Sequence, residues 1–330
     1  MLWRYALILL LFSTTALQFV SGSEAQDKQS RVQPRRLAPG VLTVIPVKPE
    51  AAETASPPRG IVEILFGVDK QVLNWQPHFT PASRTLKQLG SQVVLRRGIW
   101  QLEFAFKPLR MIEVDVPQAS GKMRRKLVWY LVYRLKNSGL HLNPVGKKDR
   151  FGSTSYELET INHTVRCFPQ LVLRSHEYDK EYLDQLIPVA VGQIQQREDP
   201  AIKLHNSVEI SRLNIPLSDE QVQRSVWGVA TWTDIDPRID FFSILVEGLS
   251  NAYHWEDTPG VYQQGDPPGT GRRYTQKTLQ LNFWRPGDAV LQHEGEIRFG
   301  LPFAADPDEQ MRFFKQYGLQ ERVDYLWVYR

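Results

Sequence analysis

The heptapeptide LVWYLVY, residues 127–133, is the longest uninterrupted apolar run of the chain after its first twenty residues. Along an extended backbone, successive side chains point to opposite faces, so this run is apolar on both faces. Five of its seven residues are aromatic or β-branched, the types that strands favour. We therefore expect a central strand that is covered on both sides, ending at the turn-forming residues Lys136, Asn137, Ser138 and Gly139.

The flanking segments alternate between apolar and polar residues. In residues 99–107, Trp100, Leu102, Phe104 and Phe106 share one face, and residues 111–116 show the same period. Arg97 and Gly98 are predicted to form a hairpin turn between residues 91–96 and 99–107. Further strands are expected at residues 61–66, 168–173, 208–215, 226–232, 241–247, 277–284, 294–299 and 323–329. Many strands without βαβ alternation predict a mainly β protein, an antiparallel sandwich with short helical insertions.

Two segments have helical patterns. From Leu183 to Ile194 the apolar residues recur with the spacing of one helix face, with an interruption or restart at Pro188, so a helical insertion is expected near residues 179–198. Asp306 followed by Pro307 reads as an N-cap and first helical position, which predicts a short C-terminal helix near residues 307–317.

Several phrases carry resemblances to known proteins. Residues 128–139, VWYLVYRLKNSG, resemble the strand and turn of bacterial immunoglobulin-like modules. The phrases VATWTDIDP (229–237), GLSNAY (248–253) and KTLQLNFW (277–284) are similar to a family of exported bacterial proteins with no assigned activity. The first resemblance implies an immunoglobulin-like sandwich, and the second implies export. Neither implies a catalytic residue.

The N-terminus has the layout of a secretory signal peptide. Arg4 precedes an apolar run, and small residues at positions 23 and 25 predict cleavage after Ala25, with a second candidate site at residues 20–22. An uncleaved anchor is the alternative, although the apolar core is shorter than the roughly 20 residues a span needs. Six prolines in residues 26–59 predict an extended tether, followed by one β-sandwich domain over residues 60–330. The expected location is periplasmic, cell-envelope or extracellular, with no transmembrane segment after cleavage.

Composition excludes several classes of protein. The 330 residues are 42% hydrophobic and 23% charged, which excludes a wholly disordered chain, and a single cysteine, Cys167, excludes an internal disulfide. Cys167 is expected to be a small buried side chain rather than a nucleophile. The seven histidines are scattered, and neither the HExxH zinc signature nor the GxSxG nucleophile motif occurs. No catalytic residue and no organic cofactor are therefore assigned.

Three carboxylates lie close together in sequence. Asp234, Asp236 and Asp240 follow a predicted strand, and hard oxygen ligands at this spacing suit Ca²⁺ or, less readily, an acid/base pair for hydrolysis. The EF-hand spacing is missing, and an aspartate before Pro237 is an ordinary turn residue because its side chain hydrogen-bonds to the local backbone. Turn formation and Ca²⁺ binding are thus the two interpretations of this cluster.

The positive charge is concentrated in one region. Residues 84–150 carry 15 Lys or Arg and 4 Asp or Glu, a net charge of +11, whereas the whole chain carries +4. Lys122, Arg124, Arg125 and Lys126 are the densest part. Such a patch attracts an anionic glycan, lipid or protein surface. Alternatively, the charges keep a sheet edge from pairing with other sheets.

These observations predict an exported, non-catalytic structural or interaction protein of the cell envelope, with a protein or envelope component as partner. The expected export, and the absence of a recognisable nucleic-acid-binding motif in the sequence, make nucleic acid an unfavourable partner. One alternative is a secreted hydrolase that uses carboxylates within residues 234–257. Another is a glycan-binding module in which Trp75 or Trp255 stacks on sugar rings.

Overall fold

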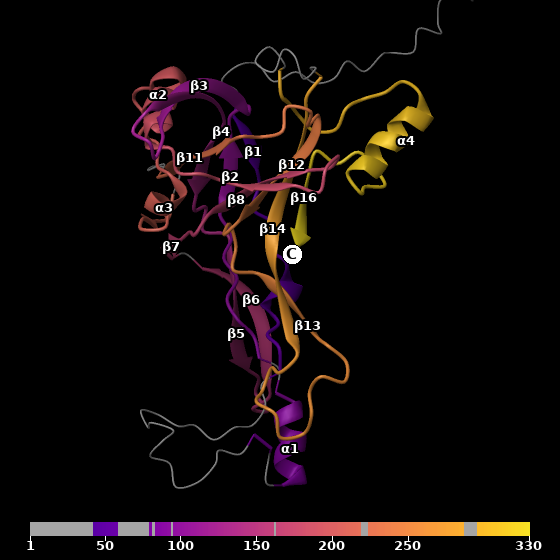
Figure 1. Cartoon of the computed structure of the whole chain (residues 1–330). Helices are drawn as coiled ribbons and strands as arrows, with labels where there is room; N and C mark the ends of the chain where they lie inside the picture. Colours follow the sequence, from indigo (N-terminus) through magenta and orange to yellow (C-terminus); the bar gives the residue numbers. More distant parts are fainter. Residues whose placement is uncertain are drawn as a thin grey trace, which may run out of the picture.

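The computed structural model describes residues 42–58, 79–80, 83–93, 95–161, 163–218, 224–286 and 296–330. The predicted signal peptide, the first part of the predicted tether, the strand expected at 61–66 and Trp75 lie outside the described residues. The protein is mainly β, with antiparallel sheets and few short helices, and it is elongated (Figure 1).

The first large sheet is built around the predicted central strand. Its strands run in the order β1, β2, β4, β11, and β3 also pairs with β4. Their bounds are β1 Thr43–Ile45, β2 Glu103–Phe106, β3 Arg110–Pro117, β4 Met123–Lys136 and β11 Val226–Thr233. All six residues of β4 from Val128 to Tyr133 are buried, which confirms that both faces of this strand are covered.

The second large sheet has the order β13, β14, β12, β8, β9, and both β15 and β16 also pair with β14. The bounds are β8 Gln170–Ser175, β9 Glu181–Leu183, β12 Phe241–Glu247, β13 Tyr253–Asp257, β14 Arg272–Trp284, β15 Arg298–Phe299 and β16 Tyr325–Tyr329. A hairpin of β5 His141–Lys148 and β6 Thr154–Ile161, and a short pair of β7 Val165–Arg166 and β10 Asn214–Ile215, complete the strands of the described residues.

The two large sheets share one core, as a sandwich requires. Trp129 of β4 meets Phe242 of β12 edge to face, with ring centroids 5.5 Å apart, and Phe106 of β2 meets Phe283 of β14 at 6.0 Å. Cys167 is fully buried in the same core, as expected. Alternate residues of β4 serve two cores, because Trp129, Leu131 and Tyr133 face the second sheet while Val128, Tyr130 and Val132 face helix α2, Pro188–Glu198. The immunoglobulin-like character remains a prediction.

Helix α2, Pro188–Glu198, begins later than the helical insertion expected near residues 179–198. Residues 181–183 form strand β9 instead, paired with β8. Pro188 stands at the start of the helix, where its missing N–H costs nothing and its fixed φ is already helical. Ala190 and Ile194 are buried beside the outer face of β4. The C-terminal helix is confirmed as α4, Pro307–Gln316, whose N-cap Asp306 accepts a hydrogen bond from the Glu309 N–H.

The strand expected at residues 208–215 is wrong in its first half. Residues Ser207–Ile210 form the one-turn helix α3, and only Asn214–Ile215 are extended. Asn206 and Glu209 form a capping box, in which each side chain accepts a hydrogen bond from the other residue's N–H. This local pairing satisfies the free donors at the helix start and outweighs the β preference of the apolar residues.

The hairpin expected around Arg97 and Gly98 is also wrong. Helix α1, Arg84–Ser91, ends at the first residue of the first arm, and the described residues of the two predicted arms do not pair with each other. Arg96 bridges to Ala55 and Ile99 bridges to Leu142, both far away in sequence. Gly98 does not adopt the positive φ that a tight hairpin turn requires.

The predicted tether ends earlier than expected, because residues 42–58 are part of the fold. Strand β1 pairs with β2, and Ala51–Thr54 form a 3-10 helix, η1. Glu53 and Thr54 are buried, and the Thr54 carbonyl accepts a hydrogen bond from the Arg97 N–H at 2.8 Å. Proline-rich sequence disfavours helix but not extended pairing, so its composition did not exclude this arrangement.

Candidate functional site

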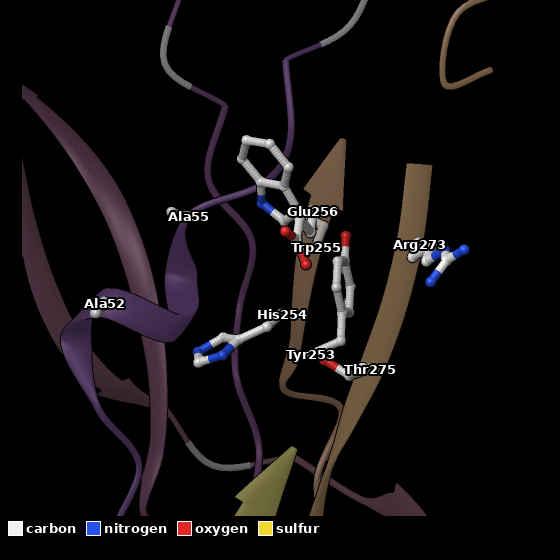
Figure 2. A pocket seen from close by; sticks show the side chains of 8 residues that line it. All are labelled: Ala52, Ala55, Tyr253, His254, Trp255, Glu256, Arg273 and Thr275. Carbon is white, nitrogen blue, oxygen red and sulfur yellow. The ribbon is translucent and has the colours of Figure 1, made fainter. Parts of the chain in front are cut away.

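An open pocket of about 590 Å³ lies where η1 meets strands β13 and β14 (Figure 2). Its lining combines aromatic rings, charged groups and two small apolar residues: Ala52, Ala55, Tyr253, His254, Trp255, Glu256, Arg273 and Thr275. A volume of this order is typical of small-molecule sites. The pocket therefore draws on three segments, one of which belongs to the N-terminal region that the sequence suggested was a tether.

The register of β13 and β14 sets the polar groups of the pocket. Glu256 lies directly opposite Arg273, and His254 lies opposite Thr275. Among the described residues, none of these four side chains forms a hydrogen bond or ion pair with another part of the protein. They retain donors and acceptors that a ligand in the pocket can use.

The aromatic rings of the pocket differ in how firmly they are held. The His254 imidazole stacks on Tyr329 of β16, with ring centroids 3.4 Å apart and planes 8° from parallel. The Arg272 guanidinium lies 5.0 Å from the centroid of the Trp255 ring. In Figure 2 the rings of His254 and Trp255 lie between β13 and η1, whereas Arg273 points away from β13 and so marks the rim.

A buried ion pair anchors η1 beneath the pocket. The Lys277 Nζ lies 2.5 Å from the Glu53 Oε1, and the two side chains are 3% and 1% exposed. The Tyr329 hydroxyl donates to the same oxygen at 2.7 Å, and burial together with this bond raises the pKa of Tyr329. Arg97 donates to the carbonyls of Glu53 and Tyr253, each at 3.0 Å. These bonds connect η1 to β13, β14 and β16 and hold the pocket walls together.

The three candidate calcium ligands lie elsewhere, and each has its own cationic partner. Asp234 lies 2.5 Å from the Lys126 Nζ, Asp236 lies 2.8 Å from Arg238, and Asp240 lies 3.5 Å from Arg285. No group of three or more acidic, His or Cys residues within the described part of the chain is arranged to hold a metal ion. The structure thus does not bring these carboxylates together as a calcium site.

Local geometry matches the turn interpretation of this cluster. The Asp236 carboxylate accepts hydrogen bonds from the Arg238 backbone N–H and guanidinium, and these bonds lower the pKa of Asp236. Asp234 has a φ of 56°, in the left-handed region that aspartate tolerates better than most residues. Both residues therefore shape the connection between β11 and β12.

The basic patch lies on the hairpin of β3 and β4, and half of it is neutralised. Arg125 pairs with Glu113, and Lys126 pairs with Asp234. Lys122 and Arg124 are exposed and form no ion pair with a described residue. The charge of Arg124 nevertheless acts on Asp234, whose pKa it helps to lower. Within the described residues, the patch is therefore partly neutralised by Glu113 and Asp234, and it attracts anions less strongly than its sequence suggests.

Other potentially reactive groups are inaccessible. Burial raises the pKa of Cys167 to about 12, which keeps the thiol protonated. His176 lies 2.6 Å from the Ser243 hydroxyl, but Ser243 is 0% exposed and also donates to Asn282 at 2.7 Å. A substrate cannot reach this serine, so the pair serves packing within the second sheet.

Sequence reasoning identified Trp255 and, among the carboxylates of residues 234–257, Glu256, but it missed the rest of the pocket. Glu256 and Arg273 lie on strands β13 and β14, which are joined by a loop of fourteen residues, 258–271. The length of this loop conceals the register that places the two residues opposite each other. Ala52 and Ala55 lie about two hundred positions away in sequence. The one signal in the sequence that could have indicated these lining residues was the alternation of aromatic and polar residues along β13 and β14.

Within the described residues, no helix is long and apolar enough to cross a membrane. Comparisons of the chain with protein-family models, with curated proteins and with solved structures found no match.

Proposed function

We propose that the protein is an exported, non-catalytic binding protein of the cell envelope, and that the pocket of η1, β13 and β14 holds a saccharide. The observation that carries this proposal is the combination of aromatic rings with unpaired Glu256, Arg273 and Thr275 side chains in one open pocket. Export rests on the signal-like N-terminus and on the resemblance to exported proteins.

Saccharide chemistry fits the pocket lining. A sugar ring presents hydroxyl groups, which both donate and accept, and hydrogen bonds to charged side chains are the strongest that such groups make. Its C–H faces pack on aromatic rings, as Trp255 and His254 offer. A purely apolar ligand would leave the Glu256 carboxylate and the Arg273 guanidinium without partners, at a cost in affinity.

The arrangement favours binding over hydrolysis. Most glycoside hydrolases place two carboxylates on either side of the scissile bond, about 5–10 Å apart. Among the described residues that line the pocket, Glu256 is the only carboxylate, and the neighbouring Asp257 accepts two hydrogen bonds from Arg272, at 2.6 and 2.9 Å. Lys122 and Arg124, on the hairpin of β3 and β4, add a second surface for an anionic envelope component.

The test is a titration of the full chain with a panel of soluble envelope oligosaccharides, followed by calorimetry or intrinsic fluorescence. Glu256→Gln and Arg273→Ala should each weaken binding about tenfold or more, because each removes a charge-assisted hydrogen bond. Arg312→Ala, which removes an exposed cation of α4, is the matched control and should bind as the unmodified chain does.

Two outcomes would reject the proposal. If no saccharide binds, or if both pocket variants bind like the control, the pocket is not a saccharide site. If the unmodified chain releases reducing ends from a polymer and Glu256→Gln does not, the protein is a hydrolase.

A further inference from the structure

Two exposed features lie at one end of the long axis, away from the two-sheet core. Helix α1 and the connection between β5 and β6 both lie at the lower end of the molecule in Figure 1. Phe151, in that connection, is 77% exposed and has the highest exposure of any large apolar residue in the described part of the chain. On α1, Leu89 is 58% exposed.

The tip of the β5–β6 hairpin presents Phe151 on a well-defined turn. The Asp149 carboxylate accepts hydrogen bonds from the N–H groups of Phe151 and Ser153, both at 2.8 Å. Gly152 takes a φ of 82°, which closes the turn. The Arg150 guanidinium lies 4.7 Å from the Phe151 ring centroid. Phe151 is thus held outward by the local backbone rather than left exposed by an irregular loop.

Helix α1 is amphipathic and packs none of its described side chains into a core. Leu86 and Leu89, with Val93 just beyond the helix, follow the spacing of one helical face, and all three are exposed. Ser83 caps the helix by accepting a hydrogen bond from the Leu86 N–H at 3.1 Å. The helix therefore forms by local capping and leaves its apolar face toward solvent.

The charges around these apolar groups are mainly positive. Arg84 and Lys87 of α1, together with Lys148 and Arg150 of the hairpin tip, are exposed, and none forms an ion pair with a described residue. Within the described residues of α1 and of the connection between β5 and β6, the one carboxylate is Asp149, which accepts hydrogen bonds in the turn. Glu157 and Glu159 of β6 lie close by, and both pair with Lys147. Apolar side chains flanked by unpaired cations complement a surface that is negative outside and apolar beneath.

We propose that this end of the molecule, α1 and the β5–β6 tip, docks on the surface of a bilayer that contains anionic phospholipid. Phe151, Leu86 and Leu89 enter the headgroup region, and the four cations lie among the lipid phosphates. The shape favours a bilayer over a protein partner, because a stable protein interface needs about 800 Å² of matching surface on each side. Two separate protruding elements suit a fluid surface, into which each inserts by itself.

The experiment uses the full chain and a site-specific probe. Cys167 is buried, so a cysteine introduced at Phe151→Cys is the accessible thiol for an environment-sensitive NBD dye, and Met311→Cys on α4 is the matched control. With vesicles of 30% phosphatidylglycerol in phosphatidylcholine, emission at position 151 should shift to the blue and rise severalfold. The emission maximum of the dye at position 311 should keep the wavelength that it has without vesicles. The blue shift and the rise in emission at position 151 should both become smaller at 0.5 M salt.

A second variant tests the charges independently of the probe. Lys148→Glu with Arg150→Glu, in the full chain, should reduce the affinity for the anionic vesicles at least about tenfold, since each cation contributes about a fivefold effect and each carboxylate adds repulsion. Circular dichroism of the free protein should be unchanged, because both residues are exposed.

The full chain also contains the apolar run of residues 5–20, and the probe at position 151 separates its contribution from that of the tip. A probe at position 151 that stays aqueous while the chain sediments with vesicles would show that this segment alone makes the contact, and would overturn the proposal. An equal blue shift with pure phosphatidylcholine, or at position 311, would also overturn it. None of these results bears on saccharide binding at the pocket.

Discussion

At the scale of single residues, His141 couples stability to pH. The ring is fully buried, and its Nε2 lies 2.8 Å from the Asn137 Oδ1, while its Nδ1 has no partner within the described residues. Burial, and then the nearby His163, lower the pKa of His141 to about 4 from an ordinary 6.5. The unfolded chain thus binds a proton at this histidine more readily than the folded chain does. The stability that the neutral, buried His141 contributes is therefore complete above pH 6.5 and is lost as the pH falls toward 4.

The prediction is a fall in the free energy of unfolding between pH 6.5 and 4. In urea titrations at pH 7, 5.5 and 4.5, His141→Gln should be less stable than the unmodified chain at pH 7 but should show a flatter pH profile. The half-buried His176, whose pKa is also lowered to about 4, mainly by desolvation, supplies a second contribution that His141→Gln leaves in place. A variant profile parallel to that of the unmodified chain would exclude His141 as a source of the pH dependence.

At the scale of elements, Gly228 permits β11 to pack beside β4. A Cβ at this position would lie 2.4 Å from the Tyr133 ring and 2.6 Å from Ile210 of α3. Both neighbours are fully buried and have no room to move away. Gly228→Ala should therefore destabilise the protein by about 1–3 kcal/mol, as overpacking of a core does.

Helix α2 offers a matched control, because a Cβ at Gly192 would meet nothing within 4 Å. Gly192→Ala should stabilise the protein by about 0.5–1 kcal/mol, since alanine has less backbone freedom to lose and a better helix propensity. Thermal and urea unfolding of the two variants check the opposite signs. Equal effects would mean that the close approach at Gly228 does not limit packing.

Elements with strong local signals were predictable from sequence. Strand β12 has the bounds expected from its apolar run, and α4 begins at the predicted cap. Elements were mispredicted where a local signal competed with the apolar pattern, as at α3, or where partners came from distant segments, as at Arg96 and Ile99. Which strands pair depends on which distant segments lie side by side in the folded chain. Hydrophobic periodicity within one segment carries no information about its partner strand.

At the scale of the whole molecule, the Glu53–Lys277 ion pair joins the N-terminal segment to β14 across 224 positions. Lys277→Met leaves the buried Glu53 carboxylate uncompensated and should cost about 3–5 kcal/mol in the free energy of unfolding. Because η1 supplies Ala52 and Ala55, the same variant should also weaken ligand binding at the pocket.

The control for this ion pair is Arg174→Met, which removes one partner of an exposed pair with Glu181. Exposed pairs contribute at most about 1 kcal/mol, so its urea midpoint should barely move. If Lys277→Met and Arg174→Met lose similar stability, the buried pair does not anchor η1.

Local sequence was sufficient for the central strand, the strands around it and the capped helix α4, because apolar periodicity and caps act between residues a few positions apart. It was also sufficient for the burial of Cys167. Only the folded arrangement established that residues 42–58 belong to the folded domain and that His254, Glu256 and Arg273 line one pocket. It also established that Asp234, Asp236 and Asp240 each form an ion pair with a different Lys or Arg side chain. Those results depend on strand register and on contacts between segments tens to hundreds of residues apart, and only the packing of the complete chain selects them.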